Sequence, residues 1–291
     1  MFKCLSRNIE IVNKPQIYRL NKGKYKEEEL IDVGGYSQIW KCEGFAIKRM
    51  LINSQETYTI AKQEINIMKR LPEHPNIIKL IDYGEVKIQN KLFFCIVMEL
   101  CEMNLQAMLS QEMLTERRII EIFKQILDGL EVLHAEQISH RDLKLENIMI
   151  KRGTCKICDF GSASNDIIDL NLLSQIELNQ IEEQFCKITT ITYRPPEMID
   201  VYKQQIIDAK VDIWQLGCIL YNLCFRKSPF QDINKLSIAQ AEFEIPQSQL
   251  SQKTLLLIQK MLQQDPKKRP NLKELKLFLY SRQIDDYDSF Q

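Results

Sequence analysis

The segment His140-Arg141-Asp142-Leu143-Lys144-Leu145-Glu146-Asn147 packs two basic residues, a carboxylate, a lysine and an amide into eight positions. The apolar run Ile148-Met149-Ile150 follows it and predicts a short strand. Asp159-Phe160-Gly161 comes twelve residues after Asn147, at the end of a second predicted strand over residues 156–158. A solvated loop could resemble the first segment and a turn the second. Their combination, downstream of the strand that contains Ala46-Ile47-Lys48, indicates one assembled site.

Two further charges occupy positions where the pattern favours apolar residues. Glu64 lies on the apolar face of a helix predicted over residues 56–71, four residues from both Ile60 and Met68. Lys48 follows an apolar, strand-like run. A carboxylate that faces a core needs a partner, so one interpretation pairs Glu64 with Lys48. The other is a frayed helix edge and a snorkelling lysine, and these two residues alone do not decide between them.

The apolar pattern changes from strands to helices near residue 100. Before this point, residues 31–40, 44–50 and 92–100 predict strands. After it, Thr115 is a candidate N-cap for a helix with one apolar stripe, made of Ile119, Phe123, Ile126, Leu130 and Leu133. Residues 211–225 are apolar on nearly every side and predict a helix inside the domain. A strand-rich small lobe followed by a helical large lobe is an α+β plan, linked here by residues 99–102.

Composition limits the possible classes of protein. The chain has 291 residues, with 39 Lys and Arg against 39 Asp and Glu, so its formal net charge is zero. This balance removes the usual electrostatic argument for bulk nucleic-acid binding, and we expect no nucleic-acid partner. Nine scattered cysteines, an odd number, predict reduced thiols in an intracellular protein. Cys155 and Cys158 lack the further ligands of a zinc site and are interpreted as core residues.

The sequence predicts neither a transmembrane segment nor a secretory signal. The longest apolar stretch lies between Asp212 and Arg226 and is shorter than the roughly 20 residues that a helical span requires. Lys3, Arg7 and Glu10 interrupt the N-terminal segment. Peripheral association with a membrane stays open, for instance through acylation of Cys4.

The charged motifs together are the signature set of protein kinases. The chain resembles a eukaryotic protein kinase from about Tyr25 to Tyr280, in motif order and in spacing. The resemblance implies the bilobal kinase fold, with ATP and Mg²⁺ as cofactors. It divides the chain into an N-terminal extension (1–24), a kinase domain (25–282) and a short C-terminal tail (283–291). Within the domain, the N-lobe covers residues 25–98, the hinge 99–102 and the C-lobe 103–282.

The resemblance assigns the ATP-binding charges to four motif residues. Lys48 matches the lysine that holds the α- and β-phosphates, and Glu64 matches the helix glutamate that positions it. Asp159 matches the magnesium-binding aspartate, and Asn147 matches the amide that helps to hold a second metal ion. Both offer the hard oxygen ligands that Mg²⁺ requires.

Two residues of the first segment are assigned to the transfer step. Asp142 matches the aspartate that accepts or orients the proton of the substrate hydroxyl. Lys144 would stabilise the transferring phosphate. A lysine at this place, in His-Arg-Asp-Leu-Lys, resembles the serine/threonine class of kinases.

The loop that would cover the ATP phosphates departs from the kinase pattern. Gly-x-Gly-x-x-Gly would fall on Asp32, Gly34 and Ser37, so only Gly34 matches. Glycines at such places let backbone N–H groups approach phosphates without a Cβ in the way. We expect an ATP lid with Tyr36 at its tip, formed by Asp32, Val33, Gly34, Gly35, Tyr36 and Ser37. A plain hairpin turn is the alternative, and whether the Asp32 carboxylate weakens ATP binding stays open.

Adenine recognition requires a flat apolar slot with backbone hydrogen-bonding groups at its edge. By position, the resemblance implies that Ile39, Ala46 and Met149 enclose the ring, with Met98 guarding the back of the slot. Glu99 and Cys101 would lend backbone groups of the hinge. Met98 and Met149 could also be core residues, and the two interpretations are compatible because the slot is part of the core.

The segment Tyr193-Arg194-Pro195-Pro196-Glu197 resembles the end of a kinase activation segment, where Ala-Pro-Glu is usual and Pro195 is a departure. The resemblance implies that Glu197 forms a buried ion pair with Arg269. It also implies that Asp212 holds the catalytic loop from the start of the buried helix. Candidate phosphate acceptors near Arg141 are Ser162, Ser164, Thr189 and Thr190. We interpret Thr190 instead as a hydrogen-bond partner of Asp142.

The activation segment is long for a kinase. Its insert, residues 167–183, has apolar residues at helical spacing, namely Leu170, Leu173, Ile176 and Leu178. An ordered helical insert and a mobile loop both fit this pattern, and we expect partial order. The resemblance places an additional helix over residues 201–210.

Four stretches make the resemblance specific to one family within the protein kinases. They are residues 34–37, 158–163, 187–202 and 214–225. Together they resemble the Numb-associated kinase family, whose members phosphorylate threonine on clathrin-adaptor subunits and regulate endocytosis or cortical actin. This resemblance implies a monomeric, cytoplasmic kinase with protein substrates. Endocytic adaptor subunits would be among those substrates, and endocytic membranes would be a place of recruitment.

Two other functions remain open at this point. Asp32, Ser37 and Pro195 suggest a pseudokinase or scaffold that binds partners without phosphoryl transfer. A small-molecule phosphotransferase of distantly related fold is the other, and the peptide-platform residues Pro196, Glu197 and Arg269 argue against it. The catalytic set is complete and predicts an active enzyme; it consists of Lys48, Glu64, Asp142, Asn147 and Asp159.

Overall fold

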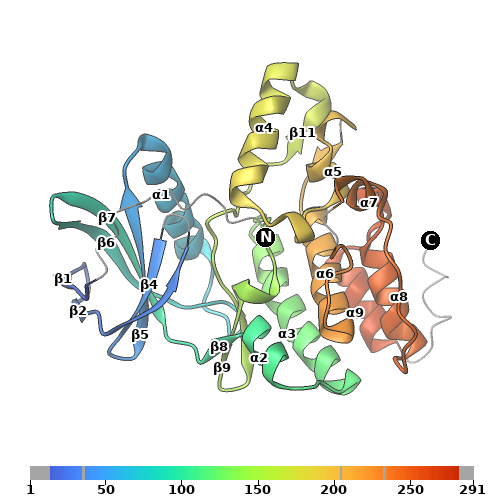
Figure 1. The fold of residues 1–291 in the computed structure, drawn as a ribbon, viewed down its shortest axis with the longest axis horizontal. Coiled ribbons are helices and arrows are strands. Elements are labelled where there is room, and N and C mark those ends of the chain that lie inside the picture. Colours follow the sequence, from blue (N-terminus) through green and yellow to red (C-terminus); the bar gives the residue numbers. More distant parts are fainter. Residues whose placement is uncertain (1–13, 35–36, 204, 232–233, 282–291) are drawn as a thin grey trace.

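The computed structural model describes residues 14–34, 37–203, 205–231 and 234–281. These residues form a small lobe built on a β-sheet and a larger helical lobe, joined by the segment 99–102 (Figure 1). The bilobal α+β plan expected from the sequence is therefore confirmed. Cys4, Gly35, Tyr36 and the tail over residues 283–291 lie outside the described residues.

The small lobe is a five-stranded antiparallel sheet with one helix against it. Its strands follow the order β3-β4-β5-β7-β6. They are β3 (Glu29–Val33), β4 (Ser37–Cys42), β5 (Phe45–Ile52), β6 (Leu80–Ile88) and β7 (Lys91–Glu99). Successive side chains of a strand point to opposite faces, so Lys48 and Arg49 of β5 serve different sides of the sheet.

Helix α1 (Gln55–Arg70) begins and ends within one residue of its predicted bounds. The Ser54 hydroxyl accepts a hydrogen bond from the backbone N–H of Thr57 and caps the N-terminus. Lys69 and Arg70 lie in the last turn, where positive charge favours the helix dipole. Glu64 is buried among the apolar residues of the same face, so α1 carries a charge into the interior of the lobe.

A hairpin of strands β1 (Ile17–Arg19) and β2 (Lys24–Lys26) lies on the other side of the sheet. Tyr18 and Tyr25 pack there against Ile47 and other buried residues of the small lobe. Glu27, just after the hairpin, is buried and forms an ion pair of 2.9 Å with Arg49. The expected boundary between residues 24 and 25 falls inside this hairpin.

The large lobe is organised around helix α6 (Lys210–Phe225), which is buried along nearly its whole length and confirms the predicted interior helix. Helices α3 (Glu116–Ala135) and α8 (Gln252–Met261) contact it. The other helices are α2 (Leu105–Gln111), α4 (Gln175–Ile188), α5 (Pro196–Ile199), α7 (Lys235–Gln240) and α9 (Leu272–Tyr280). Short strands β8 (Met103–Asn104), β9 (Ile148–Lys151) and β10 (Thr154–Ile157) form a sheet below the hinge.

The predicted stripe of α3 is confirmed, because all five of its apolar residues are buried. Thr115 caps this helix by accepting a hydrogen bond from the backbone N–H of Arg118. Gly129 lies on the same buried side and lets α3 approach the loop before β6 closely. A Cβ at this position would lie 2.6 Å from the backbone oxygen of Asn76 and 3.1 Å from Cδ1 of Ile157.

Gly129→Ala is expected to destabilise the protein by about 1–3 kcal/mol, because the added methyl group would push α3 away from this loop. The usual effect of this change inside a helix has the opposite sign, a gain of about 1 kcal/mol. Urea unfolding of the variant and of the wild type measures the difference. A variant more stable than the wild type would contradict the close approach.

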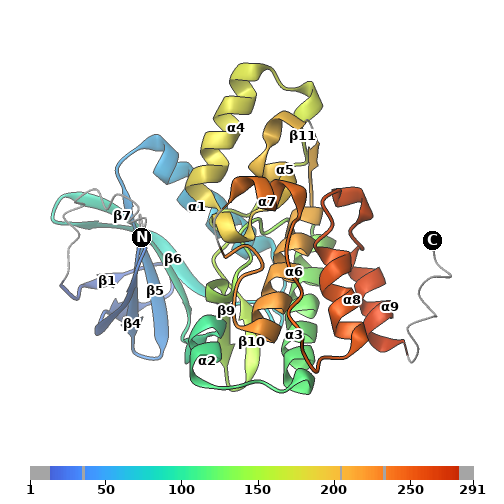
Figure 2. The ribbon, with the colours of Figure 1, turned by 45° about the vertical axis from the view of Figure 1, so that its right-hand side comes forward.

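The insert of the activation segment forms an arm that projects from the large lobe (Figures 1 and 2). It contains α4 and the antiparallel pair of strands β11 (Ile168–Asp169) and β12 (Ile206–Ile207). The predicted helix in the insert is confirmed, although it begins at Gln175 and continues to Ile188. Leu170 and Leu178 are buried as expected, whereas Ile176 is 71% exposed.

The additional helix expected over residues 201–210 is wrong. The described residues of this stretch form a single 3₁₀ turn, Val201–Lys203, and then strand β12. Ile207 pairs with Ile168 of β11 and is fully buried, together with Val201. The β-branched pair Ile206-Ile207 therefore extends to close the arm, where a helix would lose this pairing.

No helix in the described part of the chain is both long and apolar enough to cross a membrane.

Candidate active site

Strand β5 and helix α1 bring the two misplaced charges of the small lobe together. The Nζ atom of Lys48 lies 2.7 Å from Oε1 and 2.9 Å from Oε2 of Glu64. The same Nζ lies 2.7 Å from Oδ1 of Asp159, which belongs to the large lobe. The pairing interpretation is therefore confirmed, and the frayed helix with a snorkelling lysine is wrong. The three residues join the lobes through one ammonium group.

The electrostatics of this trio keep its charges in place. Burial alone would lower the pKa of Lys48, but the carboxylates of Asp159 and Glu64 outweigh it and raise that pKa. Burial raises the pKa of Glu64 and the Lys48 charge opposes this shift. The Lys48 ammonium holds the pKa of Asp159 down to about 2. Asp159 is thus an anion over the whole physiological pH range, as a cation ligand must be.

The catalytic loop arranges a second group of charges around Asp142. Lys144 Nζ lies 2.7 Å from Oδ2 of Asp142 and 2.8 Å from Oγ1 of Thr190. The backbone N–H of Thr190 donates to Oδ1 of Asp142 at 2.8 Å. The expected contact between Thr190 and Asp142 is confirmed, and the Thr190 hydroxyl binds Lys144. Each oxygen of the Asp142 carboxylate is thereby held in a defined direction.

Asn147 lies where its amide can contribute an oxygen ligand. Its Nδ2 donates to the backbone oxygen of Asp142 at 2.8 Å, and the side chain is buried. This bond fixes the amide and leaves its oxygen as an acceptor. With the Asp159 carboxylate, this gives the hard oxygen donors that Mg²⁺ prefers, so the residues present fit the implied metal.

Helix α6 holds the catalytic loop from below through two buried polar residues. Asp212 accepts hydrogen bonds from the backbone N–H groups of His140 and Arg141, both at 2.9 Å, which confirms its predicted role. Gln215 accepts from the N–H of Leu143 and donates to the backbone oxygen of Arg141, both at 2.8 Å. Sequence reasoning missed Gln215. A buried amide on a helix that is otherwise apolar was the available signal.

His134, which sequence reasoning missed, and His140, whose contacts were not predicted, complete this support. The His134 Nε2 lies 2.8 Å from Oδ2 of Asp212. The ring of His140 packs on Phe160, with 5.5 Å between ring centroids, and its Nε2 contacts the backbone oxygen of Cys158 at 3.0 Å. Phe160 is fully buried, so the residue after Asp159 anchors that strand end.

Two backbone conformations at the site are unusual for residues other than glycine. Arg141 has a φ of 65° and Asp159 a φ of 63°. Such left-handed residues cost free energy and persist where the surroundings hold them. Arg141 directly precedes Asp142, and Asp159 carries a carboxylate itself, so both unusual conformations lie at a carboxylate of the site. This agrees with a site whose geometry is imposed by tertiary contacts.

A cavity of about 650 Å³ between the lobes contains most of the predicted phosphate-side residues. Its lining includes Gly34, Ser37, Lys48, Glu64, Asp142, Lys144 and Asp159. The backbone N–H of Gly34 donates to the backbone oxygen of Ser37 at 2.8 Å. Asp32 is exposed on β3 and accepts from the N–H of Val33; neither lines this cavity.

The residues expected around adenine lie on neighbouring strands at the hinge. Ile39 is opposite Lys48, and Ala46 is opposite Met98, in the pairs β4–β5 and β5–β7. Met149 lies on β9, and Cys101 is half-buried in the hinge. None of these residues lines the 650 Å³ cavity, so their contact with adenine stays a prediction.

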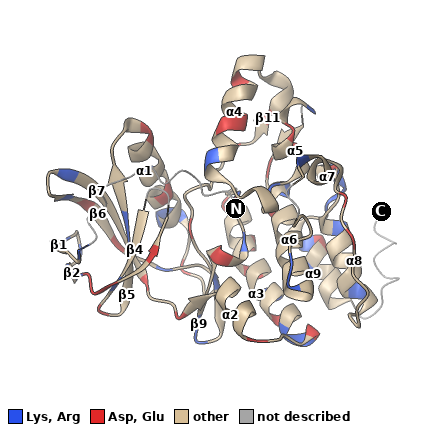
Figure 3. Ribbon diagram, in the orientation of Figure 1, with Lys and Arg blue, Asp and Glu red and all other residues tan. Residues whose placement is uncertain are grey.

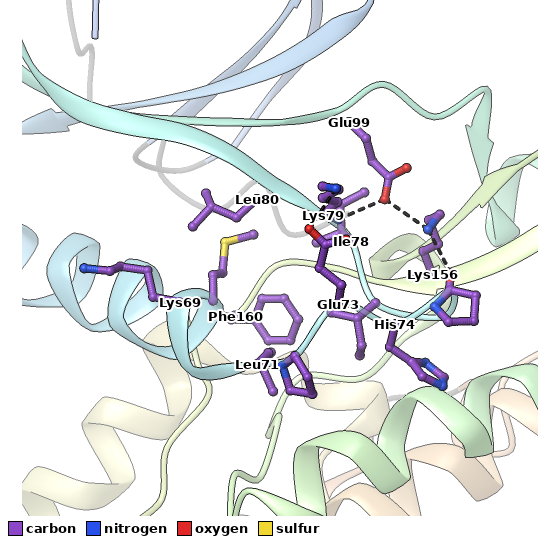
Figure 4. A pocket seen from close by; sticks show the side chains of 14 residues that line it. Lys69, Leu71, Glu73, His74, Ile78, Lys79, Leu80, Glu99, Lys156 and Phe160 are labelled. Atoms are coloured by element: carbon purple, nitrogen blue, oxygen red, sulfur yellow. Dashed lines mark hydrogen bonds and ion pairs between the residues drawn. The ribbon is translucent and has the colours of Figure 1, made fainter. Parts of the chain in front are cut away.

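The Glu99 side chain binds groups that lie behind the hinge (Figure 4). Its carboxylate accepts from the backbone N–H of Lys79 at 2.9 Å and pairs with Lys151 at 2.9 Å and with Lys156 at 3.0 Å. Lys156 and Glu99 line a second pocket, of about 480 Å³, whose floor includes Phe160. These ion pairs tie the hinge to strands β9 and β10.

The end of the activation segment is anchored as expected. Glu197 and Arg269 form two hydrogen bonds, of 2.6 and 2.7 Å, and both side chains are fully buried. Pro195, the departure from the usual Ala-Pro-Glu, precedes α5 with a φ of −74°. This value matches the angle that a proline ring imposes, so the substitution fits without strain.

A two-lobed α+β fold with a buried Lys–Glu pair, an aspartate that contacts this pair and an aspartate–lysine loop beside one interlobe cavity is the arrangement of protein kinases. A family model described as a protein kinase domain matches residues 25–280. The chain therefore belongs to the protein kinase family.

Three relatives are informative. Two probable serine/threonine-protein kinases of Dictyostelium discoideum are 36% identical over 259 residues and 34% identical over 283 residues. These alignments cover 83% and 91% of this chain, and 23% and 35% of the relatives. The actin-regulating kinase PRK1 of Saccharomyces cerevisiae is 32% identical over 263 residues, which cover 82% of this chain and 32% of PRK1. The chain thus spans about a quarter to a third of these relatives.

Proposed function

We propose that this chain transfers the γ-phosphate of Mg-ATP to serine and threonine hydroxyls of proteins, with the residues described above in the roles that follow. The observation that carries the proposal is the convergence of Lys48, Glu64 and Asp159 with Asp142 and Lys144 in one interlobe cavity. ATP brings several negative charges, and phosphoryl transfer depends mainly on holding them and on presenting the nucleophile in line.

The division of labour follows from the charges. Lys48, held by Glu64, binds the α- and β-phosphates, and Asp159 with Asn147 holds Mg²⁺, which neutralises phosphate charge when bound. Asp142 accepts or orients the proton of the substrate hydroxyl, because its carboxylate is fixed by Thr190 and Lys144. Lys144 then lies beside the transferring phosphate. The residues named here supply all of the charged groups in these proposed roles.

The nucleotide site extends beyond these charges. We assign the phosphate lid to residues 32–37, including Gly35 and Tyr36. The adenine slot is assigned to Ile39, Ala46, Met98, Met149 and the hinge residues Glu99 and Cys101. We assign the kinase domain to residues 25–282, preceded by an extension whose described part, residues 14–24, packs on the small lobe through the β1–β2 hairpin.

The substrates are proposed from the finer resemblance. The Numb-associated motifs, together with similarity to a relative named as an actin-regulating kinase, support protein substrates in endocytosis or cortical actin. Clathrin-adaptor subunits are the first candidates. The proposed place of action is the cytoplasm, with recruitment to endocytic membranes, and the chain is proposed to act as a monomer.

Lys48→Met tests the proposal in a dephosphorylated cell extract supplied with Mg-ATP. The wild-type chain should raise phosphorylation at serine and threonine sites, with endocytic or actin-associated proteins enriched among them. The variant should lose at least about 10²-fold of this activity, because a preorganised charge at the phosphates is removed. Quantitative phosphoproteomics measures both, and Lys87→Met, an exposed lysine of β6, is the matched control.

A wild-type chain that phosphorylates no protein would overturn the proposal and favour the pseudokinase. The complete catalytic set argues against that alternative. Efficient phosphorylation of a metabolite but of no protein would instead indicate a small-molecule phosphotransferase. Protein phosphorylation without enrichment of endocytic or actin-associated proteins would refute the substrate class alone.

A further inference from the structure

Arg194 is a buried cation that the proposed chemistry does not use. Its side chain is on the activation segment, two residues before Pro196, and the residue is 4% exposed. It donates to Thr189 Oγ1 at 2.8 Å and, through NH2, to the backbone oxygens of Phe185 and Thr189 at 3.0 and 3.1 Å. No ion pair between Arg194 and a carboxylate is found among the described residues. Its charge is therefore compensated by carbonyl oxygens and a hydroxyl group.

These oxygens belong to the C-terminal end of α4. The carbonyl groups at the C-terminal end of a helix carry partial negative charge, which favours a cation there. The Phe185 oxygen already accepts from the backbone N–H of Thr189 at 3.1 Å, and the Arg194 guanidinium adds a hydrogen bond to this oxygen and one to the Thr189 oxygen. Arg194 thus closes the end of α4, where the Thr189 hydroxyl also donates to the Phe185 oxygen at 2.7 Å.

The next residue of the chain touches the catalytic centre. Thr190 directs its backbone N–H to Asp142 at 2.8 Å and accepts from Lys144 at 2.8 Å. The path from Arg194 to Asp142 therefore crosses only Thr189 and Thr190. A shift of the last turn of α4 would move the groups that orient the Asp142 carboxylate.

The same turn also contacts the segment after Asp159 and the small lobe. The Ser162 hydroxyl donates to the backbone oxygen of Ile188, and Gln63 of α1 donates to the backbone oxygen of Ala163 at 3.0 Å. Lys187 lies 3.8 Å from Glu56 of α1. The charged residues along the rest of α4 are acidic, namely Glu177, Glu182 and Glu183, and the basic Lys187 lies near this end (Figure 3). The turn is a junction between α1, the segment after Asp159 and the catalytic loop.

We propose that Arg194 is a positioning residue for phosphoryl transfer: it pins the C-terminal turn of α4 and, through Thr190, sets the orientation of Asp142 and Lys144. The inference rests on the proposed function and deepens it, because it makes the insert of the activation segment part of the catalytic arrangement. Among the described residues no hydrogen bond or ion pair joins Arg194 to the Lys48–Glu64–Asp159 trio, so we expect the affinity for Mg-ATP to be unaffected by its loss.

Arg194→Met in the full chain is the primary test, with a degenerate Ser/Thr peptide library as substrate and labelled ATP. The rate at saturating Mg-ATP is expected to fall by up to about 10²-fold, since small misplacements of catalytic groups have effects of this size. The KM for Mg-ATP should stay within about twofold of the wild-type value. Arg194→Lys should recover part of the rate, because an ammonium group still donates to carbonyl oxygens.

Two further variants keep the test decisive. Arg226→Met removes another arginine that donates to a backbone oxygen, that of Glu112, at the surface of the large lobe, and should leave both constants unchanged. Thr189→Val removes the hydroxyl group that Arg194 binds but keeps the arginine, and should lower the rate even if Arg194→Met does not fold. Thermal unfolding identifies a variant that has lost its fold.

A folded Arg194→Met enzyme with the wild-type rate would overturn the inference. So would a loss of Mg-ATP affinity in parallel with the rate, or a folded Thr189→Val enzyme with an unchanged rate in the absence of folded Arg194→Met. The wild type is measured first with the same library. An inactive wild type refutes the proposed function, whereas an active wild type with an active Arg194→Met variant refutes only the role of Arg194.

Discussion

Asp142→Asn is expected to lower the rate of phosphoryl transfer by about 10²–10⁴-fold, which is the usual contribution of a general base. Asparagine keeps the shape of the side chain and can still accept a hydrogen bond from the N–H of Thr190. It cannot take up a proton and loses the charge that pairs with Lys144. The change therefore removes chemistry with little change of structure.

The measurement is the rate at saturating Mg-ATP, together with the KM for Mg-ATP. That KM should change little, because the proposed nucleotide-binding trio of Lys48, Glu64 and Asp159 is kept. Asp128→Asn, at a half-buried position of α3 where the carboxylate forms an ion pair with Lys276, is the matched control. A variant that keeps more than about a tenth of the wild-type rate would argue against a proton-accepting role.

Glu197→Gln is expected to destabilise the large lobe by about 3–5 kcal/mol, because it leaves the buried guanidinium of Arg269 without its counter-charge. Both side chains of this pair have no exposed surface. Arg269 also donates to the backbone oxygens of Gln263 and Lys210 and lies over the ring of Trp214. These neighbours hold the cation in place, so it cannot escape to water when the carboxylate is removed.

Urea unfolding measures this loss, and peptide phosphorylation reports on the platform that α5 forms. The double variant Glu197→Leu with Arg269→Met removes both charges and should be more stable than Glu197→Gln, because no uncompensated ion remains buried. If Glu197→Gln unfolded at the same urea concentration as the wild type, the ion pair would have no structural role.

The catalytic residues could be predicted because their chemical types stand out against the local pattern. Glu64 is a charge on an apolar helix face and Lys48 a charge in an apolar strand, and each needed a partner. Their distance of 2.7 Å, however, depends on how α1 packs on the sheet, and the residues alone left two interpretations open. The motif resemblance decided between them before the structure confirmed the pair.

The supporting residues were largely beyond prediction. Gln215 and Arg194 act through backbone groups that lie far away in the sequence or at the end of a neighbouring helix, and a hydrogen bond to a carbonyl oxygen leaves no trace in the residue type of the acceptor. His134 contacts the side-chain carboxylate of Asp212, which is also far away in the sequence. The helix over residues 201–210 was expected from the resemblance alone, and it is replaced by the pairing of Ile207 with Ile168.

Residues 140–147 illustrate which features the sequence predicted and which only the tertiary structure determined. Periodicity and residue chemistry by themselves determined the two-lobed plan and the interior helix, because these depend on local patterns, and the resemblance to protein kinases assigned the side chains that are expected to meet ATP and substrate. Only the tertiary structure decided that Lys144 binds both Asp142 and the Thr190 hydroxyl, that the expected contact between Thr190 and Asp142 uses the backbone N–H of Thr190, and that α4 ends beside them. Such contacts join segments that are far apart in the sequence. Lys144 binds Thr190, 46 residues later, and Asp142 is connected through Thr190 and Thr189 to Arg194, 52 residues later. Their geometry is set by packing of the arm and the lobes, which no local pattern encodes.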